Sequence, residues 1–112
     1  MKAKIYLLTG LLFISASTQA AFHCTVDVNK VLVYNNGAIN VMHSGRNDYT
    51  VICNLKIEAK GVSIPTCAMW TSMLQNIKKA KTKAIFYYPG EGTCASLSTY
   101  GNAPIPVYIG DV

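Results

Sequence analysis

Four cysteines are the residues of this 112-residue chain whose type most directly implies chemistry: Cys24, Cys53, Cys67 and Cys94. Successive cysteines are 29, 14 and 27 positions apart, and no C-x-x-C pair occurs. These spacings match neither zinc fingers and ribbons nor a dithiol redox motif. His23 and Cys24 are neighbours on a predicted strand, so their side chains point to opposite faces and share no metal ion. We expect no metal, no cofactor and two structural disulfides, for which four cysteines allow three pairings.

The residues that most resemble a catalytic triad are a histidine, a threonine and an aspartate near the predicted start of the first strand. His23, Thr25 and Asp27 share one face of a predicted strand. Positions i and i+4 of a strand are about 13 Å apart, too far for His23 to hydrogen-bond Asp27. His43 would need a partner from elsewhere, and the five acidic residues lack the close carboxyl pair of a glycosidase. We expect the protein not to be an enzyme; a small hydrolase would require that folding bring a histidine and an acid together.

Tyrosine and asparagine side chains on two turns are the candidate ligand-binding residues. A tyrosine ring offers a flat apolar face with a polar tip, and an asparagine amide both donates and accepts hydrogen bonds, which suits both to sugars. Asn-Gly and Gly-Asn pairs are also ordinary turn formers, so a purely structural role stays open. The predicted ligand-binding residues are Tyr34, Asn35 and Asn36 in the first turn and Tyr100 and Asn102 in the last loop.

The first twenty residues have the pattern of a secretory signal. Lys2 and Lys4 precede an apolar run at residues 5–14, which is shorter than the ~20 residues that cross a bilayer. Small residues at positions 18 and 20 place the predicted cleavage after Ala20. We therefore expect a secreted or periplasmic protein without a membrane span.

Residues 21–112 form one predicted domain. Seven lysines and one arginine against five acids give this part of the chain a charge of +3. A charge of that size does not argue for nucleic acid, although a basic stretch at residues 78–83 precedes three aromatic residues. We expect no nucleic-acid partner.

Residues 67–81 show the only sustained helical periodicity in the chain. Thr66 is the predicted N-cap. Trp70 is expected to pack inward on a sheet, against side chains such as Val51 and Phe86. The apolar stripe of the helix consists of Trp70, Met73, Leu74, Ile77 and Ala80.

Five strands are predicted around this helix. They cover residues 22–34, 38–42, 49–58, 83–88 and 107–109. The first strand is expected to be bent or bulged, because both of its faces become apolar after Lys30. Asn36-Gly37 predicts a type I′ hairpin turn. In the third strand, alternation predicts that Tyr49, Val51, Cys53, Leu55 and Ile57 face inward, with Ile52 as the exception.

The predicted order β-β-β-α-β-β is that of a five-stranded Greek-key barrel of the OB-like kind, with its helix between strands three and four. In this arrangement a Cys53–Cys67 disulfide would join the third strand to the start of the helix. A Cys24–Cys94 disulfide would join the first strand to the loop after the fourth. We predict these two pairings, each of which contributes roughly 2–4 kcal/mol by closing a loop.

Part of the chain resembles a known family. Cys53, a short Gly/Pro-containing connection, Cys67, Trp70 and the Ala80-Lys81 pair before a strand are similar to the OB-fold B subunits of bacterial AB5 toxins, nearest to the subtilase and typhoid-toxin type. The similarity covers residues 49–88. Residues 99–110 also resemble the tails of small uncharacterised secreted proteins of gammaproteobacteria.

The resemblance implies a pentameric, glycan- or receptor-binding subunit, and no sugar-binding residue of the family maps onto this chain. We expect a non-catalytic binding module. The alternative is a secreted inhibitor or a structural partner of another protein, which would present a protruding loop or a flat apolar patch in place of a cleft lined by tyrosine faces.

Overall fold

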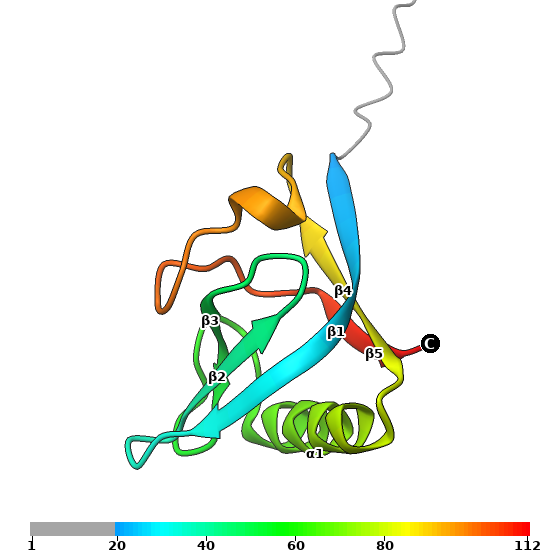
Figure 1. Ribbon diagram of the computed structural model, residues 1–112. Helices are drawn as coiled ribbons and strands as arrows, with labels where there is room; N and C mark the ends of the chain where they lie inside the picture. Colours follow the sequence, from blue (N-terminus) through cyan, green and yellow to red (C-terminus); the bar gives the residue numbers. More distant parts are fainter. Residues whose placement is uncertain (1–19) are drawn as a thin grey trace, which may run out of the picture.

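The structure is a computed structural model that describes residues 20–112, so the predicted signal lies outside the described residues except for Ala20. Five strands and one long helix follow in the predicted order, which makes the chain mainly β (Figure 1). The helix α1 spans Ile64–Ala80, and a short 3-10 helix, η1, spans Cys94–Ser96. The strands are β1 (Ala21–Val33), β2 (Ala38–His43), β3 (Tyr49–Asn54), β4 (Lys83–Pro89) and β5 (Tyr108–Asp111).

β1 is the central strand and belongs to both halves of the sheet. All five strands are antiparallel, in the order β3-β2-β1-β4-β5. The first half of β1 pairs with β4 and its second half pairs with β2. Val28 lies opposite His43 and Lys30 lies opposite Met42, so Asn29 is an extra residue in β1. The predicted irregularity of the first strand is confirmed.

The sheet is open within the described residues. β3 and β5 are its two edges, and no ladder joins them in residues 20–112. One isolated parallel bridge links Thr50 of β3 to Tyr100, in the loop before β5. In that bridge the amide of Tyr100 donates to the carbonyl of Tyr49 at 2.7 Å, and the amide of Val51 donates to the carbonyl of Tyr100 at 3.1 Å.

The inward face of β3 differs from the one that strict alternation predicts. Thr50 and Ile52 are buried, whereas Tyr49 and Val51 are partly exposed. The ladder to β2 skips Ile52, which is therefore an extra residue between Val51 and Cys53. A bulge shifts the side-chain alternation by one residue, so Ile52 and Cys53 are both buried and Tyr49 and Val51 turn outward.

β3 also ends earlier than predicted, at Asn54. The side-chain Oδ1 of Asn54 accepts hydrogen bonds from the amides of Lys56 at 2.8 Å and Ile57 at 3.2 Å. This local side-chain-to-backbone turn competes with continued strand pairing. Ile57, which was expected to face inward, is consequently 62% exposed.

The β1–β2 connection is a tight turn, but it is not the predicted type I′ turn. That turn needs positive φ at both central residues, and neither Asn35 nor Asn36 has it. The amide of Gly37 donates to the carbonyl of Tyr34 at 2.9 Å, and Gly37 alone takes a positive φ, +90°. This is the pattern of a type I turn followed by a left-handed glycine. A Cβ at Gly37 would lie 2.9 Å from the amide nitrogen of Lys56, which excludes other residues.

The helix α1 begins at Ile64, before the predicted start. Ser63 is the N-cap in place of Thr66, because its Oγ accepts a hydrogen bond from the amide of Thr66 at 3.3 Å. The helix lies across one end of the curved sheet and contacts β1, β3, β4 and β5 (Figure 1). Of the predicted apolar stripe, Trp70, Leu74 and Ile77 are buried, Met73 is half-buried and Ala80 is exposed.

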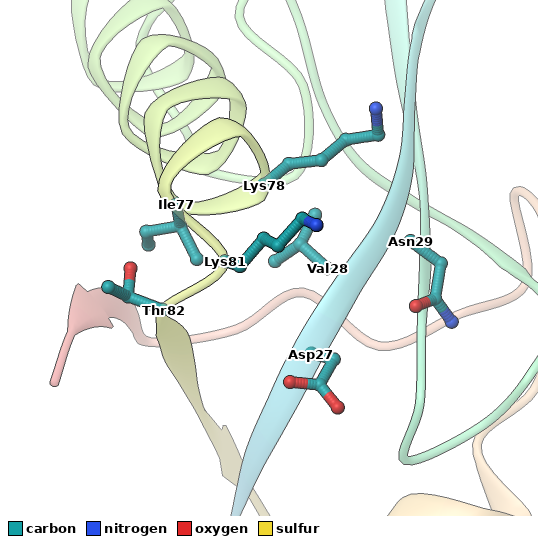
Figure 2. A pocket seen from close by; sticks show the side chains of 7 residues that line it. All are labelled: Asp27, Val28, Asn29, Ile77, Lys78, Lys81 and Thr82. Carbon is teal, nitrogen blue, oxygen red and sulfur yellow. The ribbon is translucent and has the colours of Figure 1, made fainter.

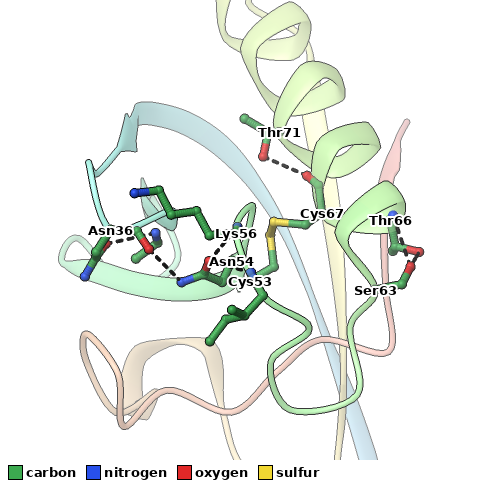
Figure 3. Close-up of a disulfide and its surroundings, with 10 residues drawn as sticks. Asn36, Cys53, Asn54, Lys56, Ser63, Thr66, Cys67 and Thr71 are labelled. Carbon is green, nitrogen blue, oxygen red and sulfur yellow. Dashed lines mark hydrogen bonds between the residues drawn. A yellow bond between two sulfur atoms is a disulfide. The ribbon is translucent and has the colours of Figure 1, made fainter.

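Both predicted disulfides are present, and no cysteine of residues 20–112 is free. Cys53–Cys67 joins the end of β3 to the first turn of α1, with 5.6 Å between the Cα atoms (Figure 3). Cys24–Cys94 joins β1 to η1, with 5.8 Å between the Cα atoms. The helix and the loop after β4 are therefore each tied to the sheet.

Candidate functional site

The two turns that carry the predicted ligand-binding residues lie at opposite ends of β3. The carbonyl of Asn36 accepts a hydrogen bond from Nδ2 of Asn54 at 3.3 Å, which sets the first turn beside the C-terminal end of the strand (Figure 3). Tyr100 is bridged to Thr50, near the other end. Thr50 and Asn54 are about 13 Å apart along the strand. The two turns thus form no single loop surface.

The three predicted asparagines have different surroundings. Oδ1 of Asn36 accepts a hydrogen bond from the amide of Ala38 at 3.0 Å, so this side chain shapes the turn. Asn35 and Asn102 are exposed, and their side chains hydrogen-bond no other residue of the described part of the chain. Of these three predicted asparagines, Asn35 and Asn102 are the two whose amides have their full hydrogen-bonding capacity available to a ligand.

Tyr100 has a strained backbone and an exposed ring. Its φ is +52°, in the left-handed region that bulky residues rarely enter. The two backbone hydrogen bonds to β3 hold it there, and its side chain is 49% exposed. The ring centroid lies 6.0 Å from that of Tyr49, with 39° between the ring planes. The geometry presents two tyrosine rings side by side in a fixed arrangement.

A second anchor fixes the loop of Tyr100 from the opposite side. Nζ of Lys60 donates to the carbonyl of Gly101 at 2.8 Å. Between this contact and the edge of β3 lies a small cavity of about 110 Å³, lined in part by Val51 and Ile105. The loop is therefore braced by β3 on one side and by the turn before α1 on the other.

Tyr34 covers a buried amide. Nδ2 of Asn40 donates to the hydroxyl of Tyr34 at 3.2 Å. Asn40 is fully buried, and its Oδ1 has no hydrogen-bond partner among the described residues. A buried acceptor without a partner costs about 1–3 kcal/mol, and such groups are rare in native structures. Tyr34 itself is 42% exposed, so the buried amide is hydrogen-bonded by a residue that reaches the surface.

These tyrosines and Asn40 share the outward face of β2 and β3. The ladder places Asn40 opposite Val51, and Met42 opposite Tyr49. Opposite residues of an antiparallel pair point to the same side, and the residues between them face the core. We name this patch the outer-face site. It consists of Tyr34, Asn40, Tyr49 and Tyr100.

Two members of the outer-face site, Asn40 and Tyr49, are absent from the residues predicted from sequence. Asn40 stands between two inward-facing residues, Ile39 and Val41, and that position alone predicts an outward amide. The cover by Tyr34 has no sequence signal. Strict alternation predicts that Tyr49 faces inward. It gives no sign of the extra residue Ile52, and the bulge at Ile52 turns Tyr49 outward.

The residues considered as catalytic candidates have separate surroundings in the described part of the chain. Asp27 is exposed and pairs with Lys83, with 2.6 Å between Oδ1 and Nζ. His43 is fully buried, its Nδ1 accepts a hydrogen bond from the amide of Gly45 at 3.1 Å, and burial lowers its pKa to about 4. His23 is exposed on β1. Residues 20–112 contain no cluster of three or more His, Cys, Asp or Glu side chains that could hold a metal ion.

Comparison with known protein families, curated proteins and solved structures finds no match for this chain. Between residues 20 and 112, no helix has both the length and the apolar character that crossing a membrane requires.

Proposed function

We propose that this chain is an exported, non-catalytic binding module whose outer-face site recognises carbohydrate. The observation that carries the proposal is the strained, half-exposed Tyr100, held beside Tyr49 by two backbone hydrogen bonds to β3. Strained residues that the surrounding structure holds in place cluster at ligand sites. A ring that is fixed before binding loses little conformational freedom when it stacks on a sugar.

The polar part of the proposed site is the amide of Asn40. A shift of the exposed Tyr34 ring would open the unpartnered Oδ1 of Asn40 to a sugar hydroxyl, which can donate to it. The free amides of Asn35 and Asn102 stand at either end of β3, where they would contact neighbouring sugar units. Aromatic faces combined with amides that both donate and accept suit the alternating apolar and hydroxyl surfaces of a sugar.

The proposal extends to an OB-like barrel of the kind found in the B subunits of AB5 toxins. Two findings support it: the central position of β1 between β2 and β4, and the parallel bridge from Thr50 to Tyr100 across the gap between β3 and the chain before β5. A receptor-binding subunit of this kind is secreted or periplasmic and self-associates. Analytical ultracentrifugation of the mature chain tests the self-association.

A glycan array tests the site. The wild-type protein is compared with Tyr100→Ala, Asn102→Ala and Asn40→Ala, and with Tyr108→Ala as a matched control, because Tyr108 is 45% exposed and lies on β5, away from the outer-face site. We expect the Tyr100 variant to lose binding and the Tyr108 variant to keep it. If folded Tyr100, Asn102 and Asn40 variants all bind as the wild type does, the site lies elsewhere.

A protein partner is the second candidate function. Val107, Tyr108 and Val112 are 58%, 45% and 63% exposed at the free edge of the sheet formed by β5 and its flanks. Exposed apolar side chains gathered at one edge are typical of a protein interface. A wild-type protein that binds no glycan on the array would favour this candidate over carbohydrate recognition.

A further inference from the structure

The pairing between β3 and the loop before β5 stops after a single bridge, and a cavity lies beside the point where it stops. The amide of Val51 donates to the carbonyl of Tyr100 at 3.1 Å. Continued parallel pairing would bring the amide of Asn102 to the carbonyl of Val51. The amide of Asn102 donates instead to the carbonyl of Thr99 at 3.2 Å, so the loop turns away from β3. The cavity of about 110 Å³ is lined by both the strand and the loop.

Two acceptors without a hydrogen-bond partner border this part of the outer-face site. In an antiparallel ladder, the N–H and the C=O of one residue point to the same side. Since the N–H of Val51 points to the loop, its carbonyl also faces the loop, where no backbone amide of the described chain donates to it. On β2, opposite Val51, the fully buried Asn40 has an Oδ1 without a partner among the described residues. Both acceptors are complementary to a ligand group that donates a hydrogen bond.

The cavity is lined largely by apolar groups. Val51, Ala59 and Ile105 contribute apolar side chains, and Gly101 contributes no side chain. Nζ of Lys60 is engaged by the carbonyl of Gly101 at 2.8 Å. The two other lining residues have side chains that are already engaged, in the disulfide and in the turn after β3: Cys53 and Asn54 (Figure 3). Since a cavity of about 150 Å³ holds one benzene ring, this cavity suits a small apolar substituent rather than a whole sugar ring.

The cavity lies within reach of a ligand on the tyrosine rings of the outer-face site. Tyr49 and Val51 are on the same face of β3, two residues and about 7 Å apart along the strand. The ring of Tyr100 is held beside that of Tyr49, and the next residue of the loop, Gly101, lines the cavity. A substituent of a sugar ring that stacks on the two tyrosines would therefore extend over Val51 and into the cavity.

We infer that the outer-face site selects N-acetylated sugars, with the methyl group of the acetamido substituent in this cavity. The inference rests on the proposed carbohydrate-binding function and names the class of sugar. The acetamido N–H would donate to the carbonyl of Val51 or to Oδ1 of Asn40. A hydroxyl in the same position can also donate, but it has no methyl group to bury. Burial of that group should favour an acetylated sugar over its parent about fivefold or more.

The larger groove at the C-terminal end of α1 has a different chemistry. Its volume is about 450 Å³, and Asp27, Lys78 and Lys81 place charges of both signs around it (Figure 2). The residues that line it include no aromatic ring and no buried side-chain acceptor without a partner. This end of the helix is therefore suitable for a control variant, and Ala80 is exposed there.

Titration of the labelled protein with four monosaccharides, followed by NMR, tests the inference. N-acetylglucosamine is compared with glucose, and N-acetylgalactosamine with galactose. We expect each acetylated sugar to bind about fivefold or more tightly than its parent, with saturable shifts at the amides of Val51 and Gly101. Ala59→Leu fills the cavity and should bring the two affinities of each pair within about twofold. Ala80→Leu is the same change at an exposed position and should leave the preference as it is in the wild type.

The outcomes separate this inference from the proposed function. Equal affinities of acetylated and parent sugars for the wild type would overturn the inference and leave carbohydrate binding in place. A preference that persists in a folded Ala59→Leu variant would mean that the methyl group lies outside the cavity, which also overturns it. The absence of shifts with all four sugars would overturn the inference as well, and the glycan array then decides on the proposed function separately.

Discussion

The ring of His43 packs against Phe86 in the core, with 4.9 Å between the centroids, and Nε2 of His43 has no hydrogen-bond partner within the described residues. The imidazole is therefore folded into an apolar environment in its neutral form. Its Nδ1 accepts the amide proton of Gly45, so the proton of the neutral ring is on the unpartnered Nε2.

This burial predicts a loss of stability in acid. The pKa of His43 falls from 6.5 to about 4 on folding, so between these two pH values the unfolded chain binds more protons than the folded one. Stability is complete above about pH 6.5 and decreases by about 3 kcal/mol by pH 4. Denaturant melts of wild type and His43→Asn across this range measure the effect, with exposed His23→Asn as control. An unchanged pH slope in His43→Asn would contradict the assignment.

The two disulfides should differ in their contribution to stability. Cys24–Cys94 spans 70 positions and Cys53–Cys67 spans 14. Loop-closure entropy predicts about 4.4 kcal/mol for the longer loop and about 3 kcal/mol for the shorter. Paired Cys→Ala variants of each bridge, compared by chemical denaturation, measure the difference. The reverse order would mean that native strain or residual structure in the unfolded chain dominates over loop length.

Trp70 should be the most costly residue of α1 to truncate. It is 8% exposed, whereas its neighbour Met69 is 70% exposed. We expect Trp70→Ala to lower the free energy of unfolding by roughly 3–5 kcal/mol, and Met69→Ala to change it by less than about 0.5 kcal/mol. Denaturant unfolding compares the two. A loss of under about 1 kcal/mol for Trp70→Ala would mean that the helix face has been assigned wrongly.

The strain at Tyr100 is measurable through a pair of variants. Tyr100→Gly and Tyr100→Ala remove the same ring contacts, but only glycine adopts a φ of +52° freely. The glycine variant should be more stable than the alanine variant by about 1 kcal/mol, while both lose glycan binding. Equal melting temperatures would show that the loop relaxes in the variants and that the ring is not held by its backbone.

The order of elements and both disulfides follow from the sequence, because hydrophobic periods and cysteine positions report on local structure. The inward face of β3 does not, since the extra residue Ile52 is recognised only from its pairing with β2. The start of α1 was misplaced for a related reason: Ser63 and Thr66 are both good caps, and only the fold selects one. A sequence pattern describes one strand or helix at a time.

The same limit applies to the candidate site. Tyr34 and Tyr100 are recognisable by residue type and turn context. Asn40 is recognised as a candidate only from the structure, in which its Nδ2 donates to the hydroxyl of Tyr34 and its Oδ1 has no partner among the described residues.

The position of β1 has a consequence for how the chain matures. Ala21 pairs with Pro89, and the carbonyl of Ala20 accepts a hydrogen bond from the amide of Gly90 at 2.7 Å. The earliest strand to be synthesised therefore completes its pairing only after nearly the whole chain has been made. The first half of β1 therefore lacks a partner strand until residues 83–89 are available, and the centre of the sheet is completed by pairing between two distant parts of the chain rather than by local hairpins alone.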